Sequence, residues 1–204
     1  MDDDVSLPQT SPSDINMYGG LQGPTFFEKI SGHLVEFIET FVVFGAIFAL
    51  IYLFIAQPHR VSGRSMFPTF YDGDLIFTDK VSYRIGPIKR GDVIVLRNPR
   101  KETEDFIKRV IVLPGETVKI QNGQVYINGN VLKENYLPAG LTTDAGAFIQ
   151  EGQEIKAGEN QYFVFGDNRP QSSDSRAWGS ITKEETVGRV FFRYWPLQSF
   201  GLIK

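Results

Sequence analysis

Two side chains of this 204-residue chain have the chemistry needed to cleave a peptide bond together. Ser65 lies in the turn of residues 62–69, just after the only long apolar run, and Lys108 follows 43 residues later within the apolar residues 106–112. Serine is a weak nucleophile that needs a base within reach, and a neutral lysine can be that base. A hydroxyl and an amine beside a membrane segment therefore indicate peptide cleavage by a serine/lysine dyad.

The strand pattern around Lys108 favours a lowered pKa. Lysine has a pKa of about 10.4, and lowering it by about 3 units takes roughly 4 kcal/mol, which burial in an apolar site supplies. In an extended strand Phe106, Lys108 and Val110 share one face, and Arg109 points to the other. The alternative is that Lys108 only keeps an edge strand soluble, and the strand alone favours that interpretation.

Two further segments could complete such a site. Gly63 permits close backbone approach and Pro68 prevents a helix from continuing, so Ser65 is presented on a constrained turn, although an ordinary loop has the same composition. Residues 166–176 combine hydroxyl groups with ionic side chains. We expect ionic pairs such as Asp174 with Arg176 to shape this loop, and one of its serines to support Lys108.

Composition excludes several other kinds of site. The chain has no cysteine, so disulfides, thiolate catalysis and cysteine-bound metal are excluded, and we expect no cofactor. A Ser-His-Asp triad would need His33 or His59, and neither is predicted to lie in a pocket. No His/Asp/Glu cluster has the spacing of metal ligands. Beyond residue 40 the charges nearly balance, which gives no case for nucleic acid binding.

The N-terminal part predicts a membrane anchor. Residues 1–25 are polar and predict a disordered tail, and residues 26–56 predict a juxtamembrane segment and one transmembrane helix. The sixteen uncharged residues 41–56 span only about 24 Å of helix, and residues 34–38 extend that toward the 30 Å or so of a bilayer core. A buried helix of a soluble domain is one alternative. A cleavable signal peptide is another, but the acidic leader argues against it.

Residues 57–204 predict a mostly β domain. Short apolar runs recur, and residues 118–120 and 125–127 alternate about Asn122-Gly123, a strong hairpin signal. No long helical periodicity follows the anchor. We therefore expect a sandwich or partly open barrel, with residues 135–160 forming a loop or irregular ribbon.

At this point the residues resemble a known family. Ser65-Met66-x-Pro68-Thr69, residues 108–115 and residues 166–176 are similar, in order, to three signature segments of bacterial type I signal peptidases, which have relatives in chloroplasts and mitochondria. The resemblance covers about residues 57–196. It implies a signal-peptidase-like β catalytic domain behind one N-terminal transmembrane helix, and a serine endopeptidase that cleaves N-terminal signal peptides through an acyl-enzyme.

The resemblance also implies roles for single residues. Ser65 would be the nucleophile, Lys108 the general base, and Ser172 the serine that orients Lys108. The N–H of Ser65 would stabilise the oxyanion, and Gly63 stands where some members have a serine that adds a second donor. Pro170-Gln171 departs from the acidic or amide residues usual there. The matching residues of structural importance are Asp167, Asn168, Arg169, Asp174 and Arg176.

The expected substrate is a preprotein with small residues before the cut. The side chains expected to wall shallow pockets for them are Val61, Met66, Phe106 and Ile107, with the peptide added as a strand to this edge. The bilayer and the secretion translocon are the other expected partners. We expect a single-pass protein of the plasma membrane with a cytoplasmic N-terminus. Arg60 and Arg64 follow the span, and by the positive-inside rule these two charges slightly favour the opposite orientation.

Two alternatives remain open at this stage. A self-cleaving repressor-type protease shares dyad chemistry, but it would carry a DNA-binding helix-turn-helix instead of an acidic membrane-spanning leader. A membrane-anchored β-domain that only binds or scaffolds is the alternative without catalysis. Acylation of Ser65 by a serine-directed probe distinguishes an enzyme from such a module.

Overall fold

The computed structural model describes residues 26–99 and 104–203. The expected tail, residues 1–25, lies outside the described residues. The chain divides into two compact units, with the boundary after Ile47, and each is described by itself below.

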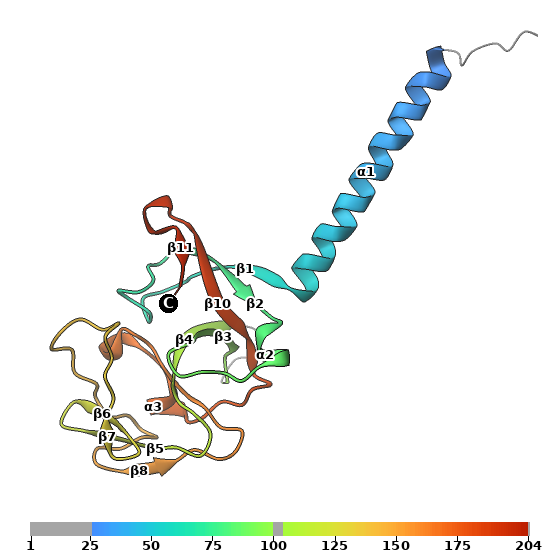
Figure 1. The fold of residues 1–204 in the computed structure, drawn as a ribbon. Coiled ribbons are helices and arrows are strands. Elements are labelled where there is room, and N and C mark those ends of the chain that lie inside the picture. Colours follow the sequence, from blue (N-terminus) through green and yellow to red (C-terminus); the bar gives the residue numbers. More distant parts are fainter. Residues whose placement is uncertain (1–25, 100–103, 204) are drawn as a thin grey trace, which may run out of the picture. The chain divides into compact units, whose positions relative to one another are not determined.

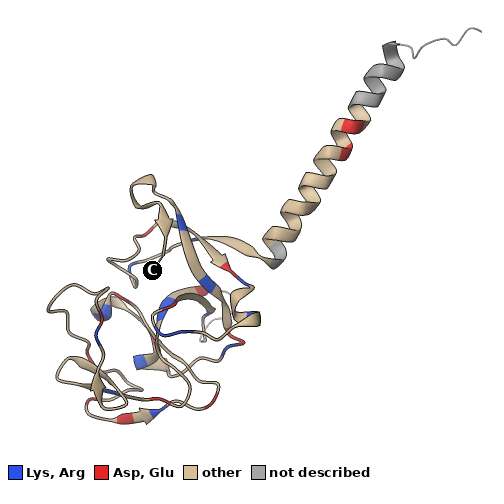
Figure 2. Ribbon diagram, in the orientation of Figure 1, with Lys and Arg blue, Asp and Glu red and all other residues tan. Residues whose placement is uncertain are grey.

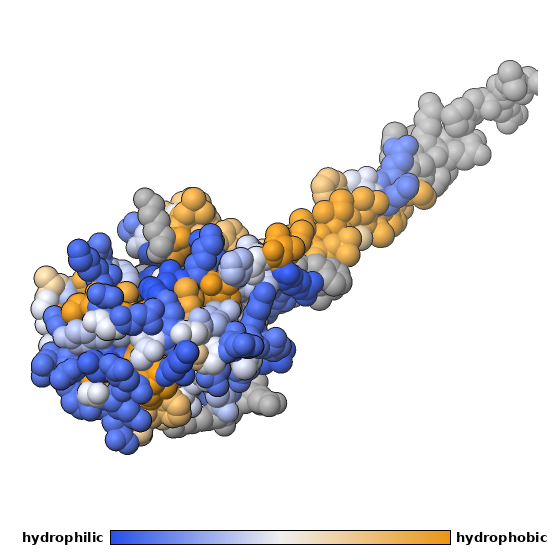
Figure 3. Space-filling view, turned by 60° about the horizontal axis from the view of Figure 1, so that its bottom comes forward, coloured by the Kyte–Doolittle hydropathy of each residue, from blue (hydrophilic) through white to orange (hydrophobic). Residues whose placement is uncertain are grey.

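One long helix, α1 (Phe26–Phe54), covers most of the predicted anchor. Its residues Leu34–Tyr52 have a mean hydropathy of 2.2, and none of that stretch is buried within the protein. Nineteen residues of helix span about 28 Å, close to the thickness of a hydrocarbon core. Glu36 and Glu39 are the acidic residues near the start of the stretch, and the apolar surface continues beyond them (Figures 2 and 3). Length and composition thus allow α1 to cross a membrane.

An antiparallel sheet of seven strands forms the larger part of the second unit (Figure 1). Its order is β1 (Ala56–Arg60), β2 (Leu75–Asp79), β10 (Thr186–Trp195), β3 (Val93–Arg97), β4 (Asp105–Val112) and β9 (Phe163–Phe165), and β11 (Gly201–Leu202) pairs with β10. Residues 105–109 of β4 pair with β3, whereas β9 pairs only with residues 109–112. The first half of β4 therefore has one edge that no strand of the described ranges pairs with.

A smaller sheet of four strands has the order β7 (Asn130–Val131), β6 (Gln124–Ile127), β5 (Thr117–Gln121) and β8 (Glu154–Lys156). The hairpin predicted at Asn122-Gly123 joins β5 to β6, and both turn residues have positive φ, 51° and 73°. That conformation matches the twist of the flanking strands, which explains why Asn-Gly is favoured there. The prediction for residues 135–160 missed β8, which lacks a long apolar run but gains its hydrogen bonds from β5.

The remaining helical elements are short: α2 (Ser82–Ile85), α3 (Ser175–Trp178) and the 3-10 turns η1 (Arg169–Gln171) and η2 (Leu197–Ser199). Strand β4 contributes Ile107, Val110 and Ile111 to three separate apolar clusters. Both faces of β4 are thus packed, which is why Lys108 and Arg109 are buried together, at 3% and 2% exposure. The mostly β architecture is the one expected from the sequence.

Candidate active site

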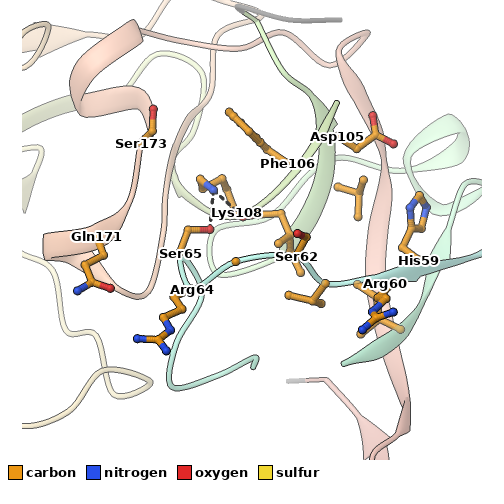
Figure 4. A pocket seen from close by; sticks show the side chains of 15 residues that line it. His59, Arg60, Ser62, Arg64, Ser65, Asp105, Phe106, Lys108, Gln171 and Ser173 are labelled. Atoms are coloured by element: carbon orange, nitrogen blue, oxygen red, sulfur yellow. Dashed lines mark hydrogen bonds between the residues drawn. The ribbon is translucent and has the colours of Figure 1, made fainter. Parts of the chain in front are cut away.

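The structure brings Ser65 and Lys108 into direct contact (Figure 4). Lys108 Nζ lies 2.8 Å from Ser65 Oγ and 3.0 Å from the backbone oxygen of Ile107, and it donates to both. It also lies 4.9 Å from the centre of the Phe106 ring. An amine held at hydrogen-bond distance from a hydroxyl can take its proton once the amine is neutral.

Burial changes the acidity of this amine. Removal from water lowers the pKa of Lys108 to about 8, against the opposing effects of Asp174 and Asp167. A neighbouring phenyl ring and packed aliphatic side chains cannot solvate an ammonium ion as water does. The amine is therefore neutral in a useful fraction of molecules near neutral pH, unlike an ordinary lysine.

The turn that carries Ser65 is anchored by side chains on both sides of the serine. Met66 and Phe70 are buried at 1% and 0% exposure in one apolar cluster, and the Phe70 N–H donates to the Met66 oxygen. Gly63 has φ +87° and its N–H donates to Asp72 at 2.8 Å. A Cβ on Gly63 would meet no atom of the protein within 4 Å, so packing within the chain does not require glycine here. Glycine suits this position because of its left-handed φ.

The loop of residues 166–176 is tied to the Ser65 turn by Asn168. Its N–H donates to the Ser65 oxygen at 3.0 Å, and its Nδ2 donates to the Arg64 oxygen at 3.0 Å. Within the loop, Asp174 accepts from the Gly166 N–H and from two nitrogens of Arg176. Asp174 is fully buried, so this ion pair shapes the loop in the way that the sequence predicted.

Two further arginines, Arg109 and Arg169, form buried ion pairs next to the site. Arg109 makes a bidentate pair with Asp167, at 2.9 and 2.7 Å, and its guanidinium lies 4.0 Å from the Tyr136 ring. Arg169 pairs with Glu134, which also accepts from the Tyr136 hydroxyl. Bidentate pairs fix the position of both partners. Glu134 and Tyr136 were missed from the sequence because their segment has no strand or turn signature.

The Ser172 hydroxyl is buried near the dyad, although the residue as a whole is only half-buried, and it does not bond to Lys108 in this structure. Its Oγ has no hydrogen-bond partner among the described residues. A Cβ on Gly166 would overlap both Ser172 Oγ and the Ser65 backbone oxygen, so Ser172 and the Ser65 turn flank the same glycine. A buried hydroxyl usually has a partner, so Ser172 Oγ is a free donor and acceptor beside the Ser65 turn.

A pocket with a cavity volume of about 270 Å³ opens at the dyad. Of the expected walls, Val61, Phe106 and Ile107 line it, whereas Met66 faces the core because its side chain fills the cluster beneath the turn. Two aliphatic residues that were not predicted from the sequence also line the pocket: Ile76 of β2 and Val95 of β3.

His59 also lines this pocket, which corrects the expectation that neither histidine would lie in one. It lies on β1, and Figure 4 places it next to Asp105, away from Ser65. Its Nε2 has no hydrogen-bond partner among the described residues, and burial lowers the pKa of His59. The contact to Ser65 Oγ comes from Lys108, not from this imidazole. In the described part of the chain, no three His, Asp or Glu side chains are grouped to hold a metal ion.

Replacing Gly166 by alanine is expected to lower the cleavage rate by about 100-fold or more. The added methyl overlaps the Ser65 carbonyl, which is backbone and cannot swing aside, and a displacement of about 1 Å at a reacting group costs about that factor. Gly158→Ala is the matched control, because its Cβ meets only the flexible Gln161 side chain. Cleavage of a precursor by both variants measures the effect, and wild-type activity of Gly166→Ala would contradict the proposed packing.

The sequence matches one protein family model and is similar to several known proteins. Residues 34–195 match the family model described as signal peptidase, peptidase S26. The chain is 38% identical over 156 residues to a probable signal peptidase I-2 of Synechocystis, covering 74% of this chain and 68% of that protein. It is 34% identical to signal peptidase IB of Staphylococcus aureus, covering 82% and 92% of the two chains. A crystal structure of an Enterococcus faecalis signal peptidase I is 32% identical, with a TM-score of 0.44, and is matched over 97% of its length and 52% of this chain.

Proposed function

Since the chain belongs to the signal peptidase family, peptidase S26, and is a serine endopeptidase that removes signal peptides, we propose that Ser65 and Lys108 carry out the cleavage. The observation that carries this assignment is the 2.8 Å contact between Lys108 Nζ and Ser65 Oγ. The lowered pKa of Lys108, about 8, supports its role as the base.

In the first half of the reaction, neutral Lys108 takes the proton of Ser65 as Oγ attacks the carbonyl carbon at the cleavage site. The negative charge that develops on the carbonyl oxygen is stabilised by the N–H of Ser65, which makes no hydrogen bond with any described residue. The intermediate then collapses, the C–N bond breaks, and the Lys108 ammonium returns its proton to the departing amine. Ser65 is left as an ester of the signal peptide.

In the second half, Lys108 is neutral again and takes a proton from a water molecule that attacks the ester. The C–O bond to Ser65 breaks, the serine recovers that proton from Lys108, and the signal peptide is released as a carboxylic acid, which then loses its proton to water. We assign to Ser172 the role of holding the Lys108 amine during these transfers. Its burial beside Gly166 and its unpartnered hydroxyl support that role.

The signal peptide would bind in an extended conformation along the unpaired edge of β4. Among the described residues only β3 pairs with residues 105–108, so the other edge is open to an added strand beside the dyad. Val61, Ile76, Val95 and Ile107 give the pocket there an aliphatic lining. The cavity of about 270 Å³ is small, which suits the small residues expected before the cut.

Activity is expected to rise with pH through about 8. Because Lys108 must be neutral to accept the proton, and its pKa is about 8 in the folded protein, roughly a tenth of the molecules are competent at pH 7. The pH profile of kcat/KM, which reports the free enzyme, should climb about tenfold per pH unit below that value and level off above it. A rate that continues to climb beyond pH 10 would point to an ordinary exposed lysine instead.

The protein is membrane-anchored, and we propose that residues 26–56 form the anchor and residues 57–204 the catalytic domain. The apolar stretch of α1 supports a contact with the lipid bilayer. We place the N-terminus in the cytoplasm and the catalytic domain outside the plasma membrane, where translocated preproteins leave the secretion translocon. Protease added to intact cells should then digest the catalytic domain. If that domain is protected until the cells are opened, the orientation is the reverse.

A further inference from the structure

A second pocket lies next to Ser65, on the side of Arg64 and Gln171. It plays no part in the reaction described above. It has a volume of about 550 Å³ and lies between the Ser65 turn and the η1 segment. Three aromatic residues, Phe67, Phe70 and Tyr71, are among those that line it, and we call it the aromatic groove. Phe70 is fully buried, whereas Phe67 and Tyr71 are 44% and 54% exposed.

The two exposed rings pack against each other edge to face. The centroids of Phe67 and Tyr71 are 5.3 Å apart and their planes meet at 86°. Rigid aromatic side chains offer a large contact area and lose little rotamer freedom when a ligand binds. Asn168, which also lines the groove, ties the η1 segment to the Ser65 turn.

The aromatic groove is continuous with the pocket at the dyad. Arg64 and Gln171 line both of them. In Figure 4, Arg64 and Gln171 lie on one side of Ser65, and Asp105 and His59 lie on the other. A peptide that runs along the β4 edge and passes Ser65 would therefore continue toward Arg64 and Gln171, and so into the groove.

An endopeptidase has chain on both sides of the bond that it cuts. If the proposed function is right, the aliphatic pocket and the β4 edge hold the signal peptide before the bond. The chain after the bond then leaves in the opposite direction, and the aromatic groove is the recess that it meets there. The placement of the departing chain in the aromatic groove depends on the proposed function.

We propose that the aromatic groove binds the first residues of the mature protein, after the cleavage site, and prefers an apolar or aromatic side chain at one of those positions. Phe67 and Tyr71 would hold that side chain over the floor formed by Phe70. The contact favours formation of the acyl-enzyme only, because this part of the substrate has left before water attacks the ester.

Matched soluble peptides test the proposal with the full-length protein in detergent. All share one sequence before the bond, and each carries a single phenylalanine in an otherwise glycine- and serine-containing stretch at the first to fourth position after it. For one position the wild type should cleave the phenylalanine peptide with about 10-fold higher kcat/KM than its glycine counterpart. Tyr71→Ala should reduce that ratio to near 1 while cleaving the glycine peptide at the wild-type rate.

Two controls separate the groove from the dyad and from folding. Tyr71→Phe keeps the ring and should keep the preference, and Phe67→Ala should lower the ratio as Tyr71→Ala does. If no position gives a preference, or if Tyr71→Ala slows both peptides equally, the aromatic groove does not bind the departing segment. If the wild type cleaves no peptide in the series, the proposed function fails and this inference fails with it.

Discussion

Cleavage of a precursor is expected to fall by about 10⁴- to 10⁶-fold when Ser65 is replaced by alanine, with the fold unchanged. The change removes the atom that attacks the carbonyl, and the rate that remains comes only from binding and oxyanion stabilisation. The Ser65 side chain lies at the mouth of the pocket and contacts Lys108, so its loss leaves the packed core intact. Precursor processing and the thermal unfolding midpoint measure the two parts of this prediction.

Ser199→Ala is the matched control for that experiment. Ser199 belongs to η2, and its backbone, not its hydroxyl, accepts from Arg193. The control should process the precursor at the wild-type rate. A serine-directed acylating probe should also label the wild type at Ser65, as an enzyme requires and a scaffold does not. Normal processing by Ser65→Ala would show that another group is the nucleophile.

Replacing Lys108 by methionine is expected to reduce cleavage by about 10³-fold or more. Methionine fills similar space without an amine, so Ser65 keeps its position but loses its base. Because the two groups act as one unit, the Ser65→Ala/Lys108→Met double variant should be about as active as Ser65→Ala alone. Lys119→Met is the control, since that strand lysine pairs with Glu154 at 3.6 Å in the smaller sheet. Multiplicative losses in the double variant would contradict a shared step.

The same substitution should stabilise the protein at neutral pH. The pKa of Lys108 falls from its ordinary 10.5 to about 8 on folding, so protonated Lys108 costs about 3 kcal/mol when buried. That cost is fully present below pH 8 and disappears as pH rises to about 10.5, because between these values the unfolded chain binds more protons. The stability advantage of Lys108→Met should therefore shrink over that range. An advantage independent of pH would indicate packing as its cause.

Much of the fold was predictable from local sequence. The hairpin at Asn122-Gly123 and the apolar runs that became β2, β3, β4, β9 and β10 have signals confined to a few residues. Strand β8 has none, because Glu154–Lys156 is a strand only through its pairing with β5. Because a long interval separates β7 from β8, the sequence also does not determine the register in which β8 pairs with β5.

The candidate site also has residues that were predictable from the local sequence and residues that were not. Ser65, Lys108 and the Asp174–Arg176 pair lie in segments whose residue types already indicate their chemistry, and the structure brings the first two to 2.8 Å. Ile76 and Val95 line the pocket because β2 and β3 pass beside it, which depends on the order of the strands. Met66 was predicted to wall the pocket, but the turn directs its side chain into the core.

The most direct test of the account is a titration of the Lys108 amine in the full-length protein. Lysine labelled with ¹³C next to Nζ gives one signal for each residue, and the signal missing from Lys108→Met identifies position 108. We expect this signal to titrate with a pKa of about 8. A midpoint above 10 would mean that the amine remains charged in the working range, and Lys108 would then not be the base that activates Ser65.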